Sequence, residues 1–144
     1  MGNRAVITTR KDFDTHGVGV YLHWCGGRDM VEAFLKYMKL RGLRPPECYG
    51  YGWARLCQVI GNYIGGDLSV GIDIIDRLDI DNFDNGTYII ENWEIVGREY
   101  FSGEEETGAD LKNTLIEIDL CQPKPDQLGK RFWNEWKEQS DEDI

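Results

Sequence analysis

The chain has 144 residues, of which 41% are hydrophobic and 12% aromatic, so it can bury a core and is too apolar for an intrinsically disordered protein. Its formal net charge of −10 opposes general nucleic-acid binding by the whole domain, and its longest apolar runs are too short to span a membrane. The charge is unevenly distributed, because residues 1–55 carry a balance of +4 and residues 56–144 a balance of −14.

The cysteines do not form a metal-binding pattern. They are Cys25, Cys48, Cys57 and Cys121, with no Cys-x-x-Cys pair among them. A structural zinc site usually needs two close pairs of ligands, and no secretory signal pattern opens the sequence. We therefore expect a cytoplasmic protein with reduced cysteines, and we predict no metal and no cofactor.

The first elements predicted along the chain are two strands. Residues 4–9 form a short β-branched run, and residues 18–24 alternate apolar and polar side chains. The polar segment 10–17 between them is interpreted as a hairpin connection.

Two amphipathic helices follow. Asp29 is the expected N-cap of the first helix, with Glu32 three residues later as in a capping box, and Gly42 ends it. The second helix is predicted over residues 52–64, where apolar side chains recur at helical spacing up to Gly65.

Three further strands are predicted over residues 68–74, 87–90 and 95–101. The first two are separated by an acidic stretch that closes at Asp84-Asn85-Gly86. Because Asn-Gly is a strong hairpin signal, we interpret this stretch as an acidic hairpin.

The last predicted elements are helices over residues 111–121 and 127–136. Strands are clustered along the chain and do not alternate strictly with helices. This order predicts an α+β fold with a mainly antiparallel sheet of about five strands and three to four helices. We expect one domain over residues 1–137 and an acidic tail over residues 138–144.

The acidic part of the chain has two interpretations. Surplus carboxylates keep a small protein soluble, and they can also form a negative surface that docks on a basic groove. For the second interpretation, the candidate partner-binding residues are Asp76, Asp79, Asp81, Asp84, Glu104, Glu105, Glu106 and Asp110. Trp93, Tyr100 and Phe101 lie nearby in the sequence and are the expected aromatic anchors.

An alternative site would bind a phosphorylated ligand. Its candidate residues are Arg4, Tyr21, His23 and Arg28, and it would make the protein a sponge that sequesters a nucleotide signal, with the ligand held at an oligomer interface.

A third possibility is a Mg²⁺-dependent hydrolase that uses the aspartates between Asp73 and Asp84, since hard cations prefer oxygen ligands. The spacing fails the EF-hand register, because Asn92 stands where a carboxylate is required. His23 and Cys25 are also too far apart along a straight strand to form a nucleophile–base pair. We predict no catalytic residue, and the enzyme question stays open.

Several segments together resemble one protein family. They are GNRAVI at 2–7, VYLHWCGG at 20–27, ARLCQVIGN at 54–62, LSVGID at 68–73 and DNGTYII at 84–90. Over roughly residues 2–101, the chain is similar to a group of small uncharacterised proteins spread through bacterial genomes, plasmids and phages. Cys25 stands where that family has Asn, so the resemblance implies no thiol chemistry and no catalytic residue.

The resemblance implies a mobile-element setting, in which small acidic proteins often block host defence. The leading hypothesis is a non-enzymatic anti-defence protein, similar in action to an anti-CRISPR inhibitor. It would place its acidic face on a protein or ribonucleoprotein effector with a basic groove and would not bind nucleic acid or membrane itself. Homo-oligomer formation is left open.

Overall fold

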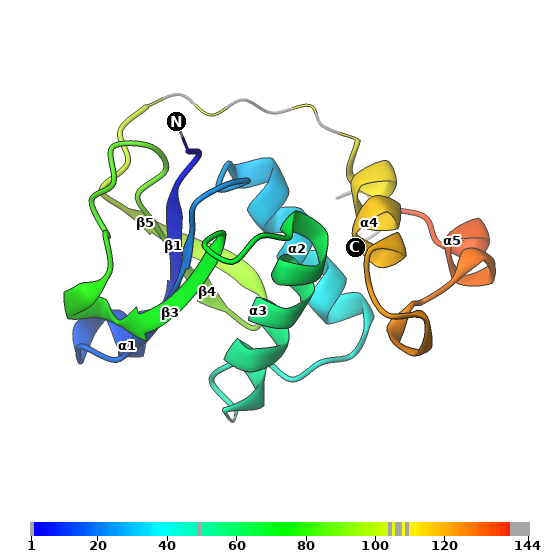
Figure 1. Ribbon diagram of the computed structural model, residues 1–144, viewed down its shortest axis with the longest axis horizontal. Helices are drawn as coiled ribbons and strands as arrows, with labels where there is room; N and C mark the ends of the chain where they lie inside the picture. Colours follow the sequence, from blue (N-terminus) through cyan, green and yellow to red (C-terminus); the bar gives the residue numbers. More distant parts are fainter. Residues whose placement is uncertain (1, 49, 104, 106–107, 109, 139–144) are drawn as a thin grey trace.

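The computed structural model describes residues 2–48, 50–103, 105, 108 and 110–138 (Figure 1). The strands are β1 (Ala5–Thr9), β2 (Val18–Leu22), β3 (Val70–Ile74), β4 (Thr87–Glu91) and β5 (Glu94–Glu99). The helices are α1 (Arg10–Asp14), α2 (Arg28–Leu40), α3 (Tyr51–Ile64), α4 (Leu111–Leu120) and α5 (Lys130–Glu135), with short 3-10 helices η1 (Ile75–Arg77) and η2 (Lys124–Asp126). The predicted α+β fold is confirmed, with α1 as an unpredicted helix among the described residues.

The five strands form one sheet in the order β3-β2-β1-β4-β5. Neighbouring strands are antiparallel except β1 and β4, which pair in parallel with Ile7 opposite Tyr88. Parallel strands need a long connection, and here the segment between them includes α2, α3 and β3. This segment returns the chain to the N-terminal end of β1, where β4 begins. The prediction of a mainly antiparallel sheet therefore holds, with one parallel pair at its centre.

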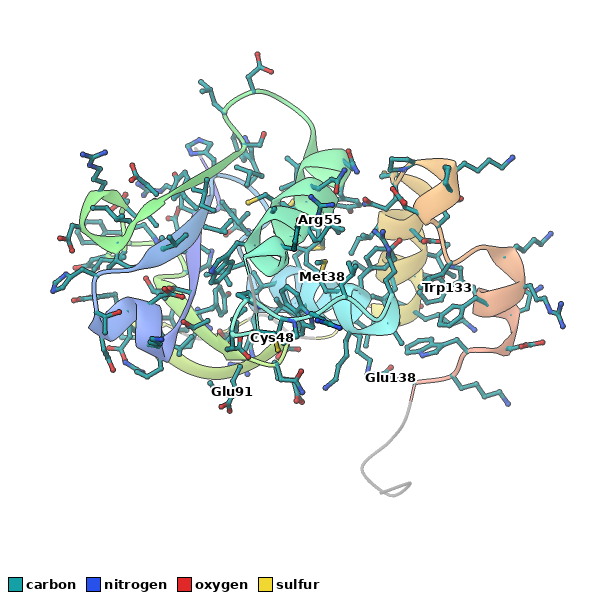
Figure 2. The ribbon with its side chains drawn as sticks, turned by 90° about the horizontal axis from the view of Figure 1, so that it is seen from below. Met38, Cys48, Arg55, Glu91, Trp133 and Glu138 are labelled. Atoms are coloured by element: carbon teal, nitrogen blue, oxygen red, sulfur yellow. The ribbon has the colours of Figure 1, made fainter. Side chains whose placement is uncertain are left out.

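Helices α2 and α3 cover one face of the sheet, and α4 and α5 lie farther along the long axis of the molecule (Figure 1). Side chains of alternate strand residues and of the helix stripes form one buried cluster, which includes Ile7, Val20, Leu22, Tyr88, Ile90, Phe34, Met38, Leu56 and Ile60. Figure 2 shows Met38 inside this layer and Trp133 on the side of α5 that faces α4. None of the described helices combines the length and the apolar composition needed to cross a bilayer.

The chain that follows β3 covers part of the opposite face of the sheet. Val6 and Ile89 on this face are buried, and Ile75 and Leu78 pack over Gly19 of β2. A Cβ at Gly19 would meet the Leu78 methyl at 2.9 Å, so glycine lets this segment lie close to the sheet. The segment from η1 to β4 is therefore part of the packed structure and not a free acidic loop.

Two local predictions are wrong and a third is incomplete. Residues 10–17 connect the antiparallel strands β1 and β2 as expected, but residues 10–14 of this connection form α1, because Thr9 caps this helix by accepting a hydrogen bond from the Asp12 N–H at 3.1 Å. The N-cap of α2 is Gly27 and not Asp29, which lies inside the first turn.

The acidic hairpin before β4 is also absent. Asn85 does not take a positive φ, and its N–H donates to the Arg4 carbonyl at 3.2 Å. The Val6 N–H donates to the Gly86 carbonyl at 3.0 Å. Asn85-Gly86 therefore starts the parallel pairing of β4 with β1 and does not turn the chain back onto β3.

Candidate partner-binding site

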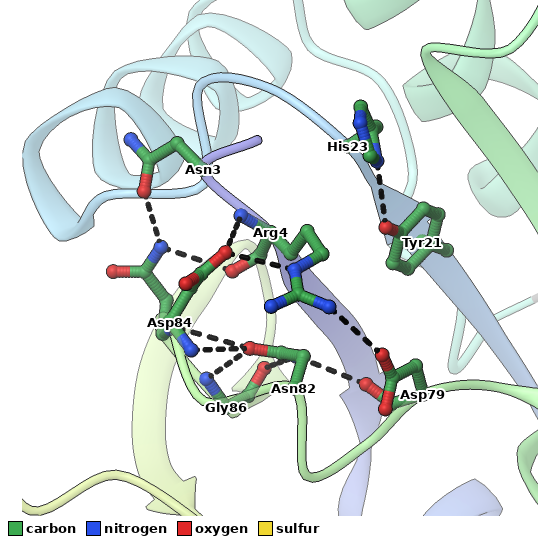
Figure 3. A network of polar contacts seen from close by, with 9 residues as sticks. Asn3, Arg4, Tyr21, His23, Asp79, Asn82, Asp84 and Gly86 are labelled. Carbon is green, nitrogen blue, oxygen red and sulfur yellow. Dashed lines mark hydrogen bonds and ion pairs between the residues drawn. The ribbon is translucent and has the colours of Figure 1, made fainter. Parts of the chain in front are cut away.

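The segment Asp79–Gly86, named here the Phe83 loop, is built around one buried asparagine (Figure 3). The Asn82 side chain is fully buried and accepts hydrogen bonds from the backbone N–H groups of Asp84, Asn85 and Gly86, at 3.0 to 3.2 Å. Its amide nitrogen donates to the carbonyls of Asp79 and Gly86. One side chain thus supplies the partners that this irregular backbone lacks, and this fixes the shape of the loop.

Arg4 attaches the Phe83 loop to the start of β1 (Figure 3). Its backbone N–H and its Nε both donate to one carboxylate oxygen of Asp84, at 3.0 and 2.9 Å, and its Nη1 lies 3.4 Å from Asp79. These hydrogen bonds lower the pKa of the Asp84 carboxyl and raise the pKa of Arg4. Asp84 and Asp79 are thus partners of a cation in this structure, even though both are partly exposed.

Arg98 of β5 holds the other side of the loop. Its Nε and Nη2 donate to the Asn85 carbonyl at 3.3 and 2.8 Å. Its guanidinium lies between the rings of Tyr88 and Phe101, at 4.0 and 3.9 Å from their centroids. Burial lowers the pKa of Arg98. The loop is therefore fixed from two sides by two arginines, Arg4 just before β1 and Arg98 in β5.

Two aromatic side chains project from this fixed framework. Phe83 is 90% exposed and Tyr100 is 51% exposed, and both have a left-handed backbone, with φ of 63° and 60°. Between them lies a shallow hollow of about 640 Å³ that Asp81 and Phe101 also line. A bulky residue in this backbone region is strained, and such strain is concentrated at functional sites. The Phe83 side chain is not packed against any other part of the described chain, so no apolar contact offsets this strain.

The eight predicted acidic residues do not form one surface. Asp76, Asp79, Asp81 and Asp84 lie together in η1 and the Phe83 loop, where Asp76 contacts His16 Nδ1 at 2.6 Å. Asp81 is exposed and has no ion-pair partner within the described ranges.

The other predicted acidic residues lie elsewhere. Glu105 contacts Arg28 and Arg98. Asp110 caps α4 by accepting a hydrogen bond from the Asn113 N–H at 3.2 Å, at the other end of the long axis from η1 (Figure 1). Glu104 and Glu106, and all of the predicted acidic tail except Glu138, lie outside the described residues.

Of the three expected aromatic anchors, only Tyr100 has a side chain exposed enough to contact a partner. Trp93 is 2% exposed, and its Nε1 donates to the Leu43 carbonyl at 2.7 Å. Phe101 packs on Arg98. The sequence reasoning missed Phe83, although a single Phe among the turn-forming residues of Asn82-Phe83-Asp84-Asn85-Gly86 is the signal that would have found it.

The residues of the alternative ligand site come together only in part. Arg4, Tyr21 and His23 are neighbours, and the Tyr21 hydroxyl contacts His23 Nδ1 at 2.9 Å (Figure 3). Arg28 lies at the start of α2 and contacts Glu32 at 2.7 Å. Since two carboxylates already surround Arg4, a phosphate would be repelled there.

Thiol and metal chemistry depend on Cys25 and on clusters of metal-ligating side chains. Burial raises the pKa of Cys25, so its thiol stays protonated near neutral pH. Within the described ranges, no three His, Cys, Asp or Glu side chains converge in a way that could hold a metal ion.

No protein-family model, curated protein or solved structure matches this chain in comparisons with known proteins. A function is therefore proposed from the physical properties of the Phe83 loop.

Proposed function

We propose that the protein is a non-enzymatic binding protein that places the Phe83 loop in a basic groove of a partner. One observation carries this proposal: a loop fixed by Asn82 and two arginines holds a Phe side chain 90% exposed in a strained backbone conformation. A fixed loop loses little entropy on binding, so an aromatic side chain on it is suited to fill a pocket.

The negative charge around Phe83 favours a partner with a positively charged surface. The rim around Phe83 carries Asp79, Asp81 and Asp84, of which Asp81 has no cationic partner in the described part of the chain. Such a rim attracts a positive surface over about a Debye length, and it raises the association rate more than the final affinity. It also disfavours direct contact with nucleic acid.

The resemblance to proteins of plasmids and phages suggests which kind of partner has this groove. A defence effector that holds a nucleic acid, such as a CRISPR or restriction complex, has a positively charged channel. An acidic loop with an aromatic tip would compete with the nucleic acid for that channel. The protein would then act as an anti-defence inhibitor.

The experiment is a plaque assay in bacteria that carry a defined CRISPR or restriction system. Cells that express the wild-type protein should support plaques of a targeted phage at about the level of defence-free cells. The double variant Phe83→Ser/Tyr100→Ser should lose most of this protection, because it removes both anchors from the surface. The matched control Tyr51→Ser removes another exposed aromatic, 62% exposed on α3, and should act as wild type.

Binding is then measured directly. The purified effector, loaded with its guide or target nucleic acid, is titrated with wild-type protein at low and high salt. Displacement of the nucleic acid should weaken as the salt concentration rises. The proposal fails if the wild type protects against none of the systems tested, or if the double variant protects as well as the wild type.

A further inference from the structure

The sheet ends in two edge strands, β3 and β5, and the two edges are built differently. β5 carries the charged side chains of Glu94, Arg98 and Glu99, and its pairing with β4 contains a register shift of the β-bulge type. Charges and bulges keep an edge strand from pairing with another chain. β3 has the sequence VGIDI, with Asp73 as its one charged residue and a regular register against β2. Of the two edges, β3 is therefore the one suited to accept a further strand.

Hydrogen bonds at both ends of β3 show which of its backbone groups bond to β2. Before the strand, the His23 N–H donates to the Ser69 carbonyl at 2.9 Å, and after it the Ile75 N–H donates to the Gly17 carbonyl at 2.7 Å. Both pairs continue the register of β2 with β3, in which hydrogen-bonded and non-hydrogen-bonded pairs alternate. The odd-numbered residues of β3 therefore bond to β2.

The even-numbered residues Val70, Ile72 and Ile74 direct their N–H and C=O groups to the open edge. The Ile74 N–H shows this directly, since it donates to the Asp73 carboxylate at 2.7 Å and not to β2. The three side chains share one face of the sheet, where Val70 packs against the core while Ile72 and Ile74 are 53% and 40% exposed. β3 leads from the end of α3 toward η1, so its second half lies away from the helix (Figure 1). The edge thus combines outward-facing backbone groups with exposed apolar side chains.

We propose that β3 pairs antiparallel with β3 of a second copy of this chain, around a two-fold axis at Ile72, so that one sheet continues across a homodimer. In this register Ile72 lies opposite its own equivalent, Val70 lies opposite Ile74, and Gly71 lies opposite Asp73. All five residues of the strand are then paired. Apolar side chains meet apolar side chains on one face, and each carboxylate faces a glycine on the other.

The sequence of β3 selects this register. An axis at Asp73 would place two carboxylates directly opposite each other, which is destabilising. An axis at Gly71 would place Ile74 opposite Leu68, which lies in the turn before the strand. An axis at Ile72 is complementary in both charge and length, and this self-complementarity is the reason to infer a second copy as the partner.

The dimer uses no residue of the Phe83 loop, so this inference and the proposed function stand or fall separately. Two chains that each carry a formal net charge of −10 repel each other, while the contact itself is largely apolar. Added salt screens this repulsion and should therefore strengthen the dimer. The same salt should weaken binding of the Phe83 loop to a basic groove, so the two associations respond in opposite directions.

The first test is analytical ultracentrifugation over a range of protein concentrations, at low and at high salt. The wild type should change from monomer to dimer with a Kd on the order of 10 μM, as a small edge contact allows. Ile72→Lys should weaken the dimer at least about tenfold, because two like charges meet at the axis. The matched control Val96→Lys places the same side chain on β5 at a comparably exposed position, 57%, and should dimerise as the wild type does.

A cysteine cross-link tests the register. The background Cys48→Ser/Cys121→Ser removes the two exposed thiols. Added to it, Ile72→Cys places two thiols directly opposite each other, with a Cα separation of about 5.5 Å that a disulfide can span. Asp73→Cys places them on the diagonal at about 7–8 Å, which is too far. Oxidation by air with copper phenanthroline should therefore cross-link the first protein and leave the second largely monomeric on a non-reducing gel.

Four outcomes would overturn the proposal. The wild type stays monomeric at high salt up to about 500 μM, well above the expected Kd. Ile72→Lys dimerises as tightly as the wild type, which would place the interface elsewhere. Val96→Lys abolishes the dimer, which would assign the interface to β5. Asp73→Cys cross-links as readily as Ile72→Cys, which would exclude the axis at Ile72.

Discussion

Two aspartates of this protein, Asp119 and Asp84, each organise a network, but they act in different surroundings. Asp119 is 1% exposed and accepts hydrogen bonds from the Tyr37 hydroxyl, the Trp133 indole and the backbone N–H groups of Leu128 and Gly129. Asp84 has a side chain that is 27% exposed, and its partner is the charged guanidinium of Arg4. The first network joins α2, α4 and α5, and the second shapes a surface loop.

The difference shows how burial decides what a carboxylate contributes. Burial alone would raise the pKa of Asp119, yet its hydrogen bonds lower it, so the charged form is stabilised by neutral donors in the interior. Removing that carboxylate leaves buried donors without partners. At Asp84, water can replace a lost partner, so stability depends on it less and the loop conformation depends on it more.

The largest expected effect tests the buried network. Asp119→Ala should lower the free energy of unfolding by about 3–5 kcal/mol, because the buried donors of Tyr37 and Trp133 lose their acceptor and a cavity forms. Urea unfolding measures the change. Glu135→Gln, on the exposed side of α5, should change stability by less than about 0.5 kcal/mol. A loss below about 1 kcal/mol for Asp119→Ala would mean that the α4–α5 region is held by apolar packing alone.

The next effect tests the Phe83 loop. Asn82→Ala should lower the free energy of unfolding by about 2–3 kcal/mol, because the N–H groups of Asp84 and Gly86 lose the oxygen they bind, while the Asn85 N–H keeps the Arg4 carbonyl as an acceptor. Hydrogen exchange should also become faster at the backbone amides of Asp84, Asn85 and Gly86. If exchange there is unchanged, the loop is held by Arg4 and Arg98, and Asn82 only fills space.

The pH dependence of stability should distinguish the two networks. The folded-state pKa values of Asp84 and Asp119 lie below the ordinary value of 3.8, so both groups contribute stability above that pH and lose it as the pH falls through their folded-state values. Thermal unfolding from pH 6 down to pH 2 should show a fall in Tm that begins near pH 4. Asp119→Asn should flatten this fall more than Asp84→Asn does. An equal flattening would place the two carboxylates in equivalent environments.

The smallest effect is also the most specific for function. Phe83→Gly should leave stability unchanged or raise it by about 0.5 kcal/mol, because glycine relieves the strain of the left-handed backbone and no buried surface is lost. Thermal unfolding measures this change. A large loss of stability would show that Phe83 is a structural residue and would remove the main support for partner binding.

Gly86→Ala is the matched contrast within the same loop. Gly86 also has a positive φ, but a Cβ there would collide with the backbone carbonyls of Glu99 and Tyr100. This variant should therefore be clearly destabilised, by more than about 1 kcal/mol. Together, the two variants distinguish Gly86, which the fold requires, from Phe83, whose side chain is exposed and does not contribute to stability.

Much of the secondary structure could be predicted from the sequence, because its signals are local. Alternating side chains located the strands, and helical spacing located α2, α3 and α4 within a residue or two of their observed ends. The acidic residues from Asp76 to Asp84 were also recognised as one group. The Thr9-x-x-Asp12 pattern that begins α1 was present in the sequence but was interpreted as a polar connection.

The arrangement of the candidate sites was decided by tertiary structure. Arg4 is 80 residues from Asp84, and Arg98 meets Arg28 at Glu105 only because β4 pairs in parallel with β1 and carries β5 to that edge. No local pattern encodes such a pairing, since contacts between distant segments depend on how all the apolar faces pack together. The sequence by itself determined the elements and the sign of the charge near Phe83. The packed fold determined which carboxylates have partners, which aromatic side chains stay exposed, and where two arginines share one anion, because burial and proximity are properties of the folded chain.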